Sequence, residues 1–301
     1  MRTGTEKASD MPAGPVTWRI AGGRVLGPAP FFVVGIVNCT PDSFYDGGRF
    51  VDSGAGISRS LELLEQGADI VDIGGESTRP FSERISLEDE RDRVLPVLSG
   101  VLDHKPQAVV SVDTYRARIA DEALQAGAAI VNDVTACSLD PELIRVLADH
   151  QPGYVLMHSK GRPEDMQKDP WYSDVVGEVL SFFETGMDRL VQAGMPQECI
   201  VLDPGIGFGK LLKHNLELLA NIEKFATLGR PIYMGLSNKS MWSKLLNLPL
   251  NERPMATQVA TGLLAAKGVP IHRVHEVDDT LRTLRIVQAL QEHAGGGKNG
   301  R

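Results

Sequence analysis

Eight short apolar runs divide the chain, and each is followed by a longer segment in which apolar residues recur at helical spacing. The runs are continuously apolar, which is typical of strands covered on both faces in a parallel sheet. They occupy residues 31–37, 70–73, 108–112, 130–131, 154–157, 200–202, 231–234 and 271–274. This pattern predicts parallel strands that alternate with helices.

Helix signals lie between these runs. In 57–66, Ile57, Leu61 and Leu64 share one face of a helix. Ser86 stands before acidic residues, which indicates a helix N-cap followed by an acidic first turn. Glycines that can take the left-handed position after a helix precede several strands, at Gly67, Gly127, Gly194 and Gly268.

Eight strand–helix units predict an α/β protein with a single (β/α)₈ barrel, the TIM-barrel fold. A doubly wound open sheet is the competing fold, but it usually has fewer strands and a glycine-rich fingerprint after the first strand, which is missing here. No linker divides the chain. We expect a flexible leader at 1–17, one barrel domain at 18–294 and a flexible tail at 295–301.

Composition narrows the class of partner to small molecules. The chain has 301 residues, of which 42% are hydrophobic and 23% charged, and this is the composition of a globular protein. A net charge of −8 disfavours nucleic acid and anionic lipid as partners. There is no apolar run long enough to cross a membrane. Three scattered cysteines predict small buried thiols in a reducing cytoplasm rather than disulfides or a zinc site.

Polar residues follow every predicted strand. A single Asp or Asn at such a point often caps the next helix, and for Asp72 or Asp133 alone we favour that interpretation. In a barrel, however, all the strands end at the face that carries the active site. We therefore expect a site on that rim, built from Asn38, Asp72, Asp113, Asn132, Asp133, His158, Asp203, residues 237–240 and His275.

Longer strings surround these positions. They are GIVNCTPDSFYDGG at 35–48, DIGGESTRP at 72–80, SVDT at 111–114, NDV at 132–134, LMH at 156–158, LDPGIGFGK at 202–210, GLSNKS at 235–240 and RVH at 273–275. In order and spacing, this set resembles the dihydropteroate synthase family of pterin-binding TIM barrels, from about residue 31 to 290. The resemblance implies a transferase of folate biosynthesis that condenses 6-hydroxymethyl-7,8-dihydropterin diphosphate with 4-aminobenzoate and releases diphosphate. It also implies Mg²⁺ and a homodimer.

The resemblance implies a pterin pocket made of Asp203, Asp113 and Asn132, with Met157 beside them. A buried carboxylate can accept two N–H donors of the aminopyrimidine edge through strong charge-assisted bonds. The alternative for Asp203 is a turn residue that caps the Pro-Gly loop. GIGFGK lacks the glycine spacing and the Ser/Thr of a phosphate loop, so we expect its glycines to let backbone approach the ligand, with Phe208 as an apolar wall.

Diphosphate requires local cations in a chain of negative net charge. Arg79, Arg273 and His275 are the candidates, and Thr78 and Asn38 can add hydrogen bonds. The two residues of the RVH string that lie two apart, Arg273 and His275, should point to the same side of their strand. His275 could instead be a core histidine. The resemblance places Asn38 on the Mg²⁺ ion, which prefers oxygen ligands and retained waters.

For aminobenzoate the resemblance implies Lys239 and Ser240. In the family's usual mechanism the C–O bond breaks first. We expect Asp42 and Asp113 to stabilise the pterin cation, and the phosphate-binding cations, Arg273 among them, to stabilise the leaving group. Two departures from the family pattern occur. Asn238 replaces an Arg, which predicts a lost loop contact or a weaker anion field. Phe81 replaces a Gly, which predicts a stiffer second loop or a crowded entrance for aminobenzoate.

Other functions remain open at this point. A corrinoid methyltransferase that binds methyltetrahydrofolate shares the pterin barrel but needs no diphosphate pocket, which Thr78-Arg79 and Arg273-Val-His275 argue against. A Schiff-base aldolase would use Lys239 as its nucleophile. A non-catalytic pterin-binding protein would fit if Asn238 marks a loss of activity.

Overall fold

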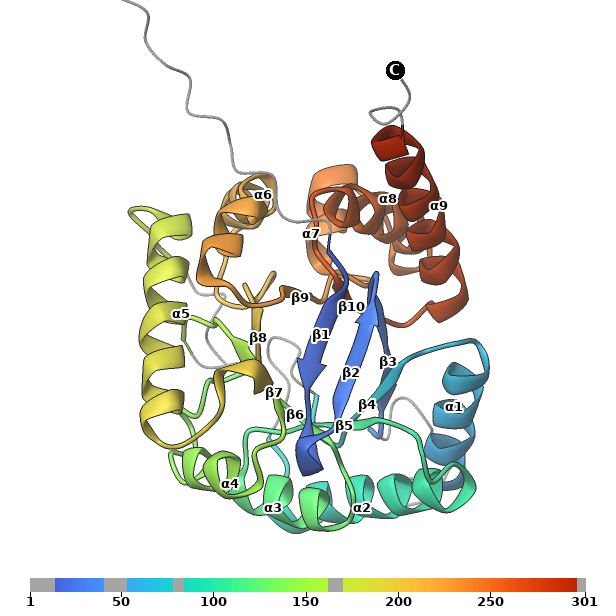
Figure 1. Ribbon diagram of the computed structural model, residues 1–301, viewed down its shortest axis with the longest axis vertical. Coiled ribbons are helices and arrows are strands. Elements are labelled where there is room, and N and C mark those ends of the chain that lie inside the picture. Colours follow the sequence, from blue (N-terminus) through green and yellow to red (C-terminus); the bar gives the residue numbers. More distant parts are fainter. Residues whose placement is uncertain (1–13, 41–52, 78–83, 162–169, 297–301) are drawn as a thin grey trace, which may run out of the picture.

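A computed structural model describes residues 14–40, 53–77, 84–161 and 170–296 of the chain. Its centre is a sheet of parallel strands in the order β8-β7-β6-β5-β4-β3-β10-β9. Figure 1 shows the helices around the outside of these strands. The barrel strands are β3 (Phe32–Asn38), β4 (Ile70–Gly74), β5 (Val110–Asp113), β6 (Ile130–Asp133), β7 (Gly153–Met157), β8 (Ile200–Asp203), β9 (Tyr233–Met234) and β10 (Ile271–Val274).

The two ends of this sheet meet and close it into a barrel. Ile232, next to β9, forms a parallel bridge with Leu202 of β8, and the Leu202 N–H donates to the Pro231 carbonyl over 3.0 Å. The predicted (β/α)₈ barrel is therefore confirmed, and each of the eight predicted apolar runs overlaps a strand. The short β9 is the least regular of them, because only two of its residues are in ladder geometry.

Helices cover the outer face of the strands. They are α1 (Ser53–Glu65), α2 (Leu87–His104), α3 (Ala117–Gln125), α4 (Leu143–His150), α5 (Val175–Gln192), α6 (Leu212–Ala220), α7 (Ser240–Leu246), α8 (Arg253–Ala266) and α9 (Val277–Gly296). The predicted cap at Ser86 is present, since its side chain accepts from the Asp89 N–H at the start of α2. Gly67, Gly127, Gly194 and Gly268 all have positive φ, as expected of residues that end a helix.

Hydrophobic packing forms two layers. The larger cluster fills the space between strands and helices, and the smaller one fills the lower barrel interior with Phe32, Val34, Ile70, Val109, Ile130, Val155, Val201, Tyr233 and Ile271. On β3, Phe32 and Val34 lie two positions apart and both belong to this interior cluster, because alternate side chains of a strand face the same side. The polar strand ends lie above this apolar floor.

A hairpin of β1 (Val16–Arg19) and β2 (Val25–Ala29), which the sequence did not predict, covers the N-terminal end of the barrel strands and lies in front of them in Figure 1. Trp18 is buried in the interior cluster and its Nε1 donates to the Cys199 carbonyl over 2.7 Å. The expected leader at 1–17 was therefore too long at its end, because the strand already begins at Val16. At the other end, α9 extends to Gly296, beyond the expected start of the tail at 295.

No helix among the described residues is long and apolar enough to cross a membrane.

Candidate active site

Arg273 forms the centre of the polar rim. Its Nε donates to Asp72 Oδ2 over 2.6 Å, and its Nη2 donates to Asp113 Oδ2 over 2.6 Å. The Asn132 side chain donates to the same Asp72 oxygen over 3.0 Å. Strands β4, β5, β6 and β10 thus supply one connected group of charged and polar side chains, and it includes three of the predicted site residues.

Burial controls the charges of this group. Burial raises the pKa of Asp113 to about 7, although the Arg273 guanidinium acts to lower it. For Arg273 burial works in the opposite direction, but the carboxylates of Asp72 and Asp113 outweigh it and raise the pKa above its ordinary value. Arg273 therefore stays charged while Asp113 can change its protonation near neutral pH.

The sequence interpretation placed Asp72 on the rim but assigned it to no subsite. Treated alone it was expected to be a helix cap, but its carboxylate is fully buried and holds Arg273 and Asn132. The available signal in the sequence was that Asp72 lies two positions before Gly74, the end of the strand. Residues two apart in a strand face the same side, so Asp72 faces the interior together with the strand end. Its second oxygen, Oδ1, has no hydrogen-bond partner among the described residues.

Asp133 differs from Asp72 and follows the local interpretation. It accepts from the Thr135 N–H and hydroxyl, from the Cys137 N–H and from the Tyr154 hydroxyl, all within 2.6–3.0 Å. These bonds fix the turn after β6 and the outer face of β7. Asp133 is thus a structural residue and does not point to the rim.

Asp203 lies at the end of β8 and is buried, with 7% of its surface exposed. Its Oδ1 accepts from the Gly205 N–H over 2.7 Å, so the turn-capping interpretation is correct for this oxygen. Burial raises the pKa of Asp203, and the Gly205 bond and the positive charges of Lys239, Lys210 and Arg273 act against that rise. A carboxylate oxygen has two lone pairs, so capping the turn does not prevent it from accepting from a ligand.

Lys239 lies beside Asp203 and Phe208. Its Nζ is 4.3 Å from the centre of the Phe208 ring, a cation–π contact. Burial lowers the pKa of Lys239 to about 8, against the opposing charge of Asp203. The loop after β9 therefore brings an ammonium group to the wall formed by the loop after β8. Ser240 follows as the exposed first residue of α7.

His275 is bonded to a side chain of the neighbouring loop. Its Nδ1 lies 2.8 Å from Ser237 Oγ, and Ser237 Oγ also donates to Glu276 over 3.0 Å. A hydroxyl has one proton, so His275 Nδ1 carries the proton in its bond with Ser237. At Nδ1, therefore, the partner of His275 is a side chain and not the backbone.

Asn238 turns toward Glu276. Its Nδ2 donates to Glu276 Oε1 over 3.0 Å, and its backbone has a positive φ of 57°. Asn tolerates this left-handed conformation better than most residues. Arg253 donates to the Asn238 carbonyl over 3.1 Å. The loop at the departure from the family pattern thus has its own set of contacts.

The remaining predicted residues divide into two groups. Asn38 and Met157 lie at the ends of β3 and β7, on the same rim as Asp113 and Asp203. Asp42, Thr78, Arg79 and Phe81 lie outside the described residues. Among the described residues, no group of three His, Cys, Asp or Glu side chains could hold a metal ion.

Comparisons with known proteins agree with this geometry. The family described as "Pterin binding enzyme" matches residues 34–275. The dihydropteroate synthase of Synechocystis is 39% identical over 260 residues, which cover 86% of this chain and 90% of that protein. The Escherichia coli dihydropteroate synthase is 38% identical over 257 residues, with coverage of 85% and 90%.

Solved structures show the same likeness. The Xanthomonas albilineans dihydropteroate synthase with 4-aminobenzoic acid superposes with a TM-score of 0.85 at 37% identity, covering 92% of this chain and 98% of that one. The same enzyme in complex with 7,8-dihydropteroate gives a TM-score of 0.82 at 35% identity, with coverage of 92% and 99%.

Proposed function

Since this chain belongs to the dihydropteroate synthases of the pterin-binding enzyme family, we propose that its rim contains three adjoining subsites for the reaction of that family. The reaction is a transfer: 6-hydroxymethyl-7,8-dihydropterin diphosphate and 4-aminobenzoate give 7,8-dihydropteroate and diphosphate in folate biosynthesis. The observation that supports this assignment best is Arg273 held between Asp72 and Asp113, because it combines a fixed cation with buried acceptors.

The pterin subsite comprises Asp203, Asn132 and Asp113, with Met157 at the neighbouring strand end. The buried carboxylates accept from the N–H groups of the ring, and the amide of Asn132 can donate or accept. Phe208 closes one side as an apolar wall. Such bonds are strong here because the groups are buried and already in position.

The diphosphate subsite uses Arg273 and His275, together with Thr78 and Arg79 outside the described residues. Arg273 cannot swing freely toward an anion, because two of its nitrogens are engaged by Asp72 and Asp113. Its fixed position lets it stabilise charge on the leaving oxygen without reorganisation. Lys239 adds a second positive charge, and both it and Arg273 interact electrostatically with Asp203.

The chemical step breaks one C–O bond and forms one C–N bond. The electron pair of the C–O bond leaves with diphosphate, where Arg273 and Lys239 stabilise it. Asp113, with Asp42, stabilises the positive charge left on the pterin methylene. The amine of 4-aminobenzoate, positioned by Lys239 and Ser240, then attacks the methylene carbon, and its proton passes to the released diphosphate or to water. No covalent bond to the protein is needed.

Mg²⁺ fits this site only as an ion carried by the substrate. Asn38 offers one amide oxygen at the end of β3, and the described residues contain no cluster of acidic or His ligands. Mg²⁺ commonly takes few protein ligands and completes its shell with phosphate oxygens and water. We assign Asn38 as its protein ligand, where the ion would neutralise diphosphate charge.

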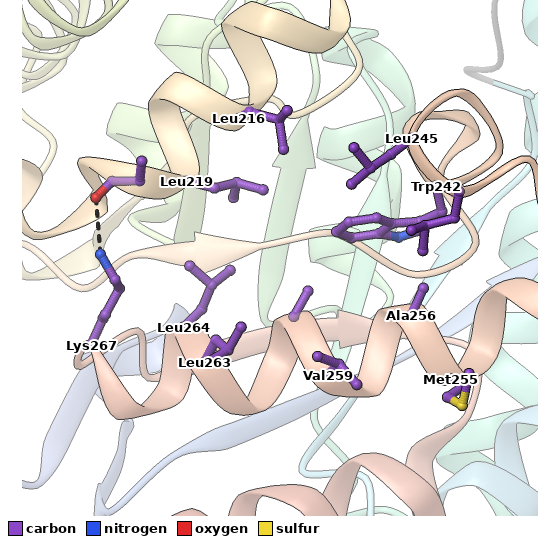
Figure 2. Close-up of a pocket in the computed structure, with 13 residues that line it drawn as sticks. Leu216, Leu219, Trp242, Leu245, Met255, Ala256, Val259, Leu263, Leu264 and Lys267 are labelled. Atoms are coloured by element: carbon purple, nitrogen blue, oxygen red, sulfur yellow. Dashed lines mark hydrogen bonds between the residues drawn. The ribbon is translucent and has the colours of Figure 1, made fainter.

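A homodimer is supported by an exposed apolar face. Met255, Val259 and Leu263 recur every four residues on α8 and are 73%, 60% and 63% exposed. Figure 2 shows them along a groove between α8, α6 and α7, with Leu216 and Leu245 on its other side. The groove has a volume of about 480 Å³. A second copy of the chain can bury such a face in a symmetric, self-complementary contact.

The three free, buried cysteines support a location in the cytoplasm.

The test is formation of dihydropteroate from both purified substrates, with and without Mg²⁺. Turnover that needs both substrates and stops on chelation supports the full assignment. Tight pterin binding without turnover would favour a non-catalytic pterin-binding protein. Turnover unaffected by chelation would remove Mg²⁺ and the role of Asn38 as its ligand.

A further inference from the structure

Lys210, at the end of the glycine-rich loop after β8, is a buried cation, with only 2% of its surface exposed. Its Nζ contacts four acceptors: His158 Nδ1 at 2.9 Å, the His158 carbonyl at 3.2 Å, the Gly205 carbonyl at 3.0 Å and the Phe208 carbonyl at 3.1 Å. Two of these acceptors lie on the segment after β7 and two on the loop itself. One ammonium group therefore joins two neighbouring active-site loops.

These contacts use the whole donor capacity of Lys210. An ammonium group has three N–H donors, and here four acceptors share them. Burial lowers the pKa of Lys210 to about 7, but three carbonyls and an imidazole nitrogen are partners that the charged form satisfies best. A diphosphate could bind Lys210 only by displacing bonds that hold the loop.

His158 is fixed by the same contact. Burial, followed by the charge of Lys210, lowers the pKa of His158 to about 2, so the imidazole is neutral. Because Nδ1 accepts from Lys210, the ring proton is on Nε2. The ring packs edge to face against Phe182, with 4.9 Å between ring centres, so it cannot easily turn to another arrangement.

The two loops also touch through their backbones. A Cβ at Gly205 would lie 1.9 Å from the His158 carbonyl oxygen, and a Cβ at Gly209 would lie 2.1 Å from the Lys160 carbonyl oxygen. Both glycines have positive φ. The loop after β8 thus packs directly against residues 158–160. Phe208 lies between Gly205 and Gly209, the two residues at which the backbones approach most closely.

We propose that Lys210 is a positioning residue, which clamps the loop after β8 to the end of β7 and so sets the pterin wall at Phe208 and the turn at Asp203. It does not bind diphosphate, although it is a cation that interacts electrostatically with Asp203 and Lys239. Asp203 supports this, because its Oδ1 bonds the N–H of Gly205, whose carbonyl accepts from Lys210. The proposal rests on the proposed function for the identity of the ligand.

The first experiment compares two ligands in Lys210→Met by calorimetric titration. The ligands are the dihydropterin diphosphate and the pterin alcohol that lacks diphosphate. A positioning role predicts that both dissociation constants rise by the same factor, about tenfold, as for one lost charge-assisted hydrogen bond. Lys213→Met is the matched control, because Lys213 is exposed on the following helix and its loss removes the same charge.

A selective loss of diphosphate affinity in Lys210→Met would overturn the proposal in favour of an anion contact. Unchanged affinity for both ligands in the folded variant would also overturn it. His158→Phe keeps the aromatic shape and removes one acceptor, so it should weaken both ligands equally but less. It provides the same comparison if Lys210→Met does not fold.

A second measurement needs no ligand. Nitrogen NMR of the free protein should show His158 as the neutral Nε2–H tautomer, with an Nδ1 signal that shifts in Lys210→Met and not in Lys213→Met. A His158 signal that does not respond to Lys210→Met would refute the clamp. If the shift is seen but the wild-type protein binds neither pterin ligand, the clamp stands and the proposed function fails.

Discussion

Arg273 and Asp113, 160 positions apart in the chain, are joined across the barrel by a 2.6 Å hydrogen bond from Nη2 to Oδ2. The bond links the residue assigned to diphosphate with a residue assigned to the pterin ring. A change at either residue therefore alters both subsites. This coupling determines what single substitutions can report about the site.

Arg273→Ala should weaken binding of the dihydropterin diphosphate more than binding of the pterin alcohol, and both should weaken. The diphosphate ester loses its contact with the Arg273 guanidinium. In addition, both ligands bind next to Asp113, which has lost its ion-pair partner and therefore protonates more readily. Calorimetric titration of both ligands measures this. An equal loss for the two would show that Arg273 serves only the ring pocket.

Asp203→Asn should reduce the affinity for a pterin analogue, because an amide cannot accept from two N–H donors as a carboxylate does. The expected cost is about 1.5–3 kcal/mol, typical of a lost hydrogen bond to a charged group. Thermal unfolding serves as the control, since the Gly205 N–H keeps an acceptor in the amide oxygen. A folded variant with wild-type affinity would remove Asp203 from the pocket.

Turnover should depend on pH through Asp113 and Lys239. Burial raises the pKa of Asp113 to about 7, so the carboxylate that stabilises the pterin cation is lost as the pH falls below that value. Burial lowers the pKa of Lys239 to about 8, so its positive charge is lost as the pH rises above that value. The profile of kcat/KM should rise toward about 7 and fall above about 8.

The variant Lys239→Arg tests the alkaline side of this profile. A guanidinium stays charged throughout this range, so the fall above about 8 should disappear even if the maximum rate is lower. The acid side should remain as in the wild type. An unchanged alkaline limb would assign that titration to another group.

Asn238→Arg should lower stability by about 1–2 kcal/mol, because φ at this position is 57° and residues other than Gly and Asn pay that cost in the left-handed region. The KM for 4-aminobenzoate should fall or stay similar, and the KM for the pterin ester should not change. Asn238→Gly is the control, since it keeps the backbone and removes the bond to Glu276. Loss of turnover in Asn238→Arg would show that this loop depends on Asn.

Val259→Lys should convert the proposed dimer to a monomer at micromolar concentration, because it places a charge in the middle of the apolar face of α8. Sedimentation velocity measures the mass of the species. Val191→Lys on α5 is the control, since that residue is also exposed but lies on another helix. A dimer that survives Val259→Lys would place the contact elsewhere.

The sequence alone was sufficient for the eight barrel strands and for most of the rim, because continuous apolar runs and polar strand ends have a direct physical cause. It was not sufficient for Asp72. The sequence pattern around an Asp near the end of a strand is the same whether the side chain caps a helix or faces the interior. The two positions are distinguished only by the register across the sheet, in which Asp72 pairs with Ser111 and Ile36.

The hairpin β1–β2 was missed for a different reason. Its strands have four and five residues and a bulge in their pairing. Its burial comes from contacts with residues far along the chain, which local patterning does not report. Asn238 is a third case: the exchange with Arg was visible, but the positive φ and the bond to Glu276 were not.

The Trp18–Cys199 hydrogen bond also constrains the order in which the molecule can be completed. Its two ends are 181 positions apart, and the Trp18 ring also packs against Tyr233 of β9. During synthesis the ribosome releases the first strands long before these partners exist. The beginning of the chain must therefore wait, with its tryptophan unburied, until most of the barrel has emerged. Trp18 can therefore reach its native contacts only after residue 233 has been synthesised, so its burial is a late step for a strand that is made early.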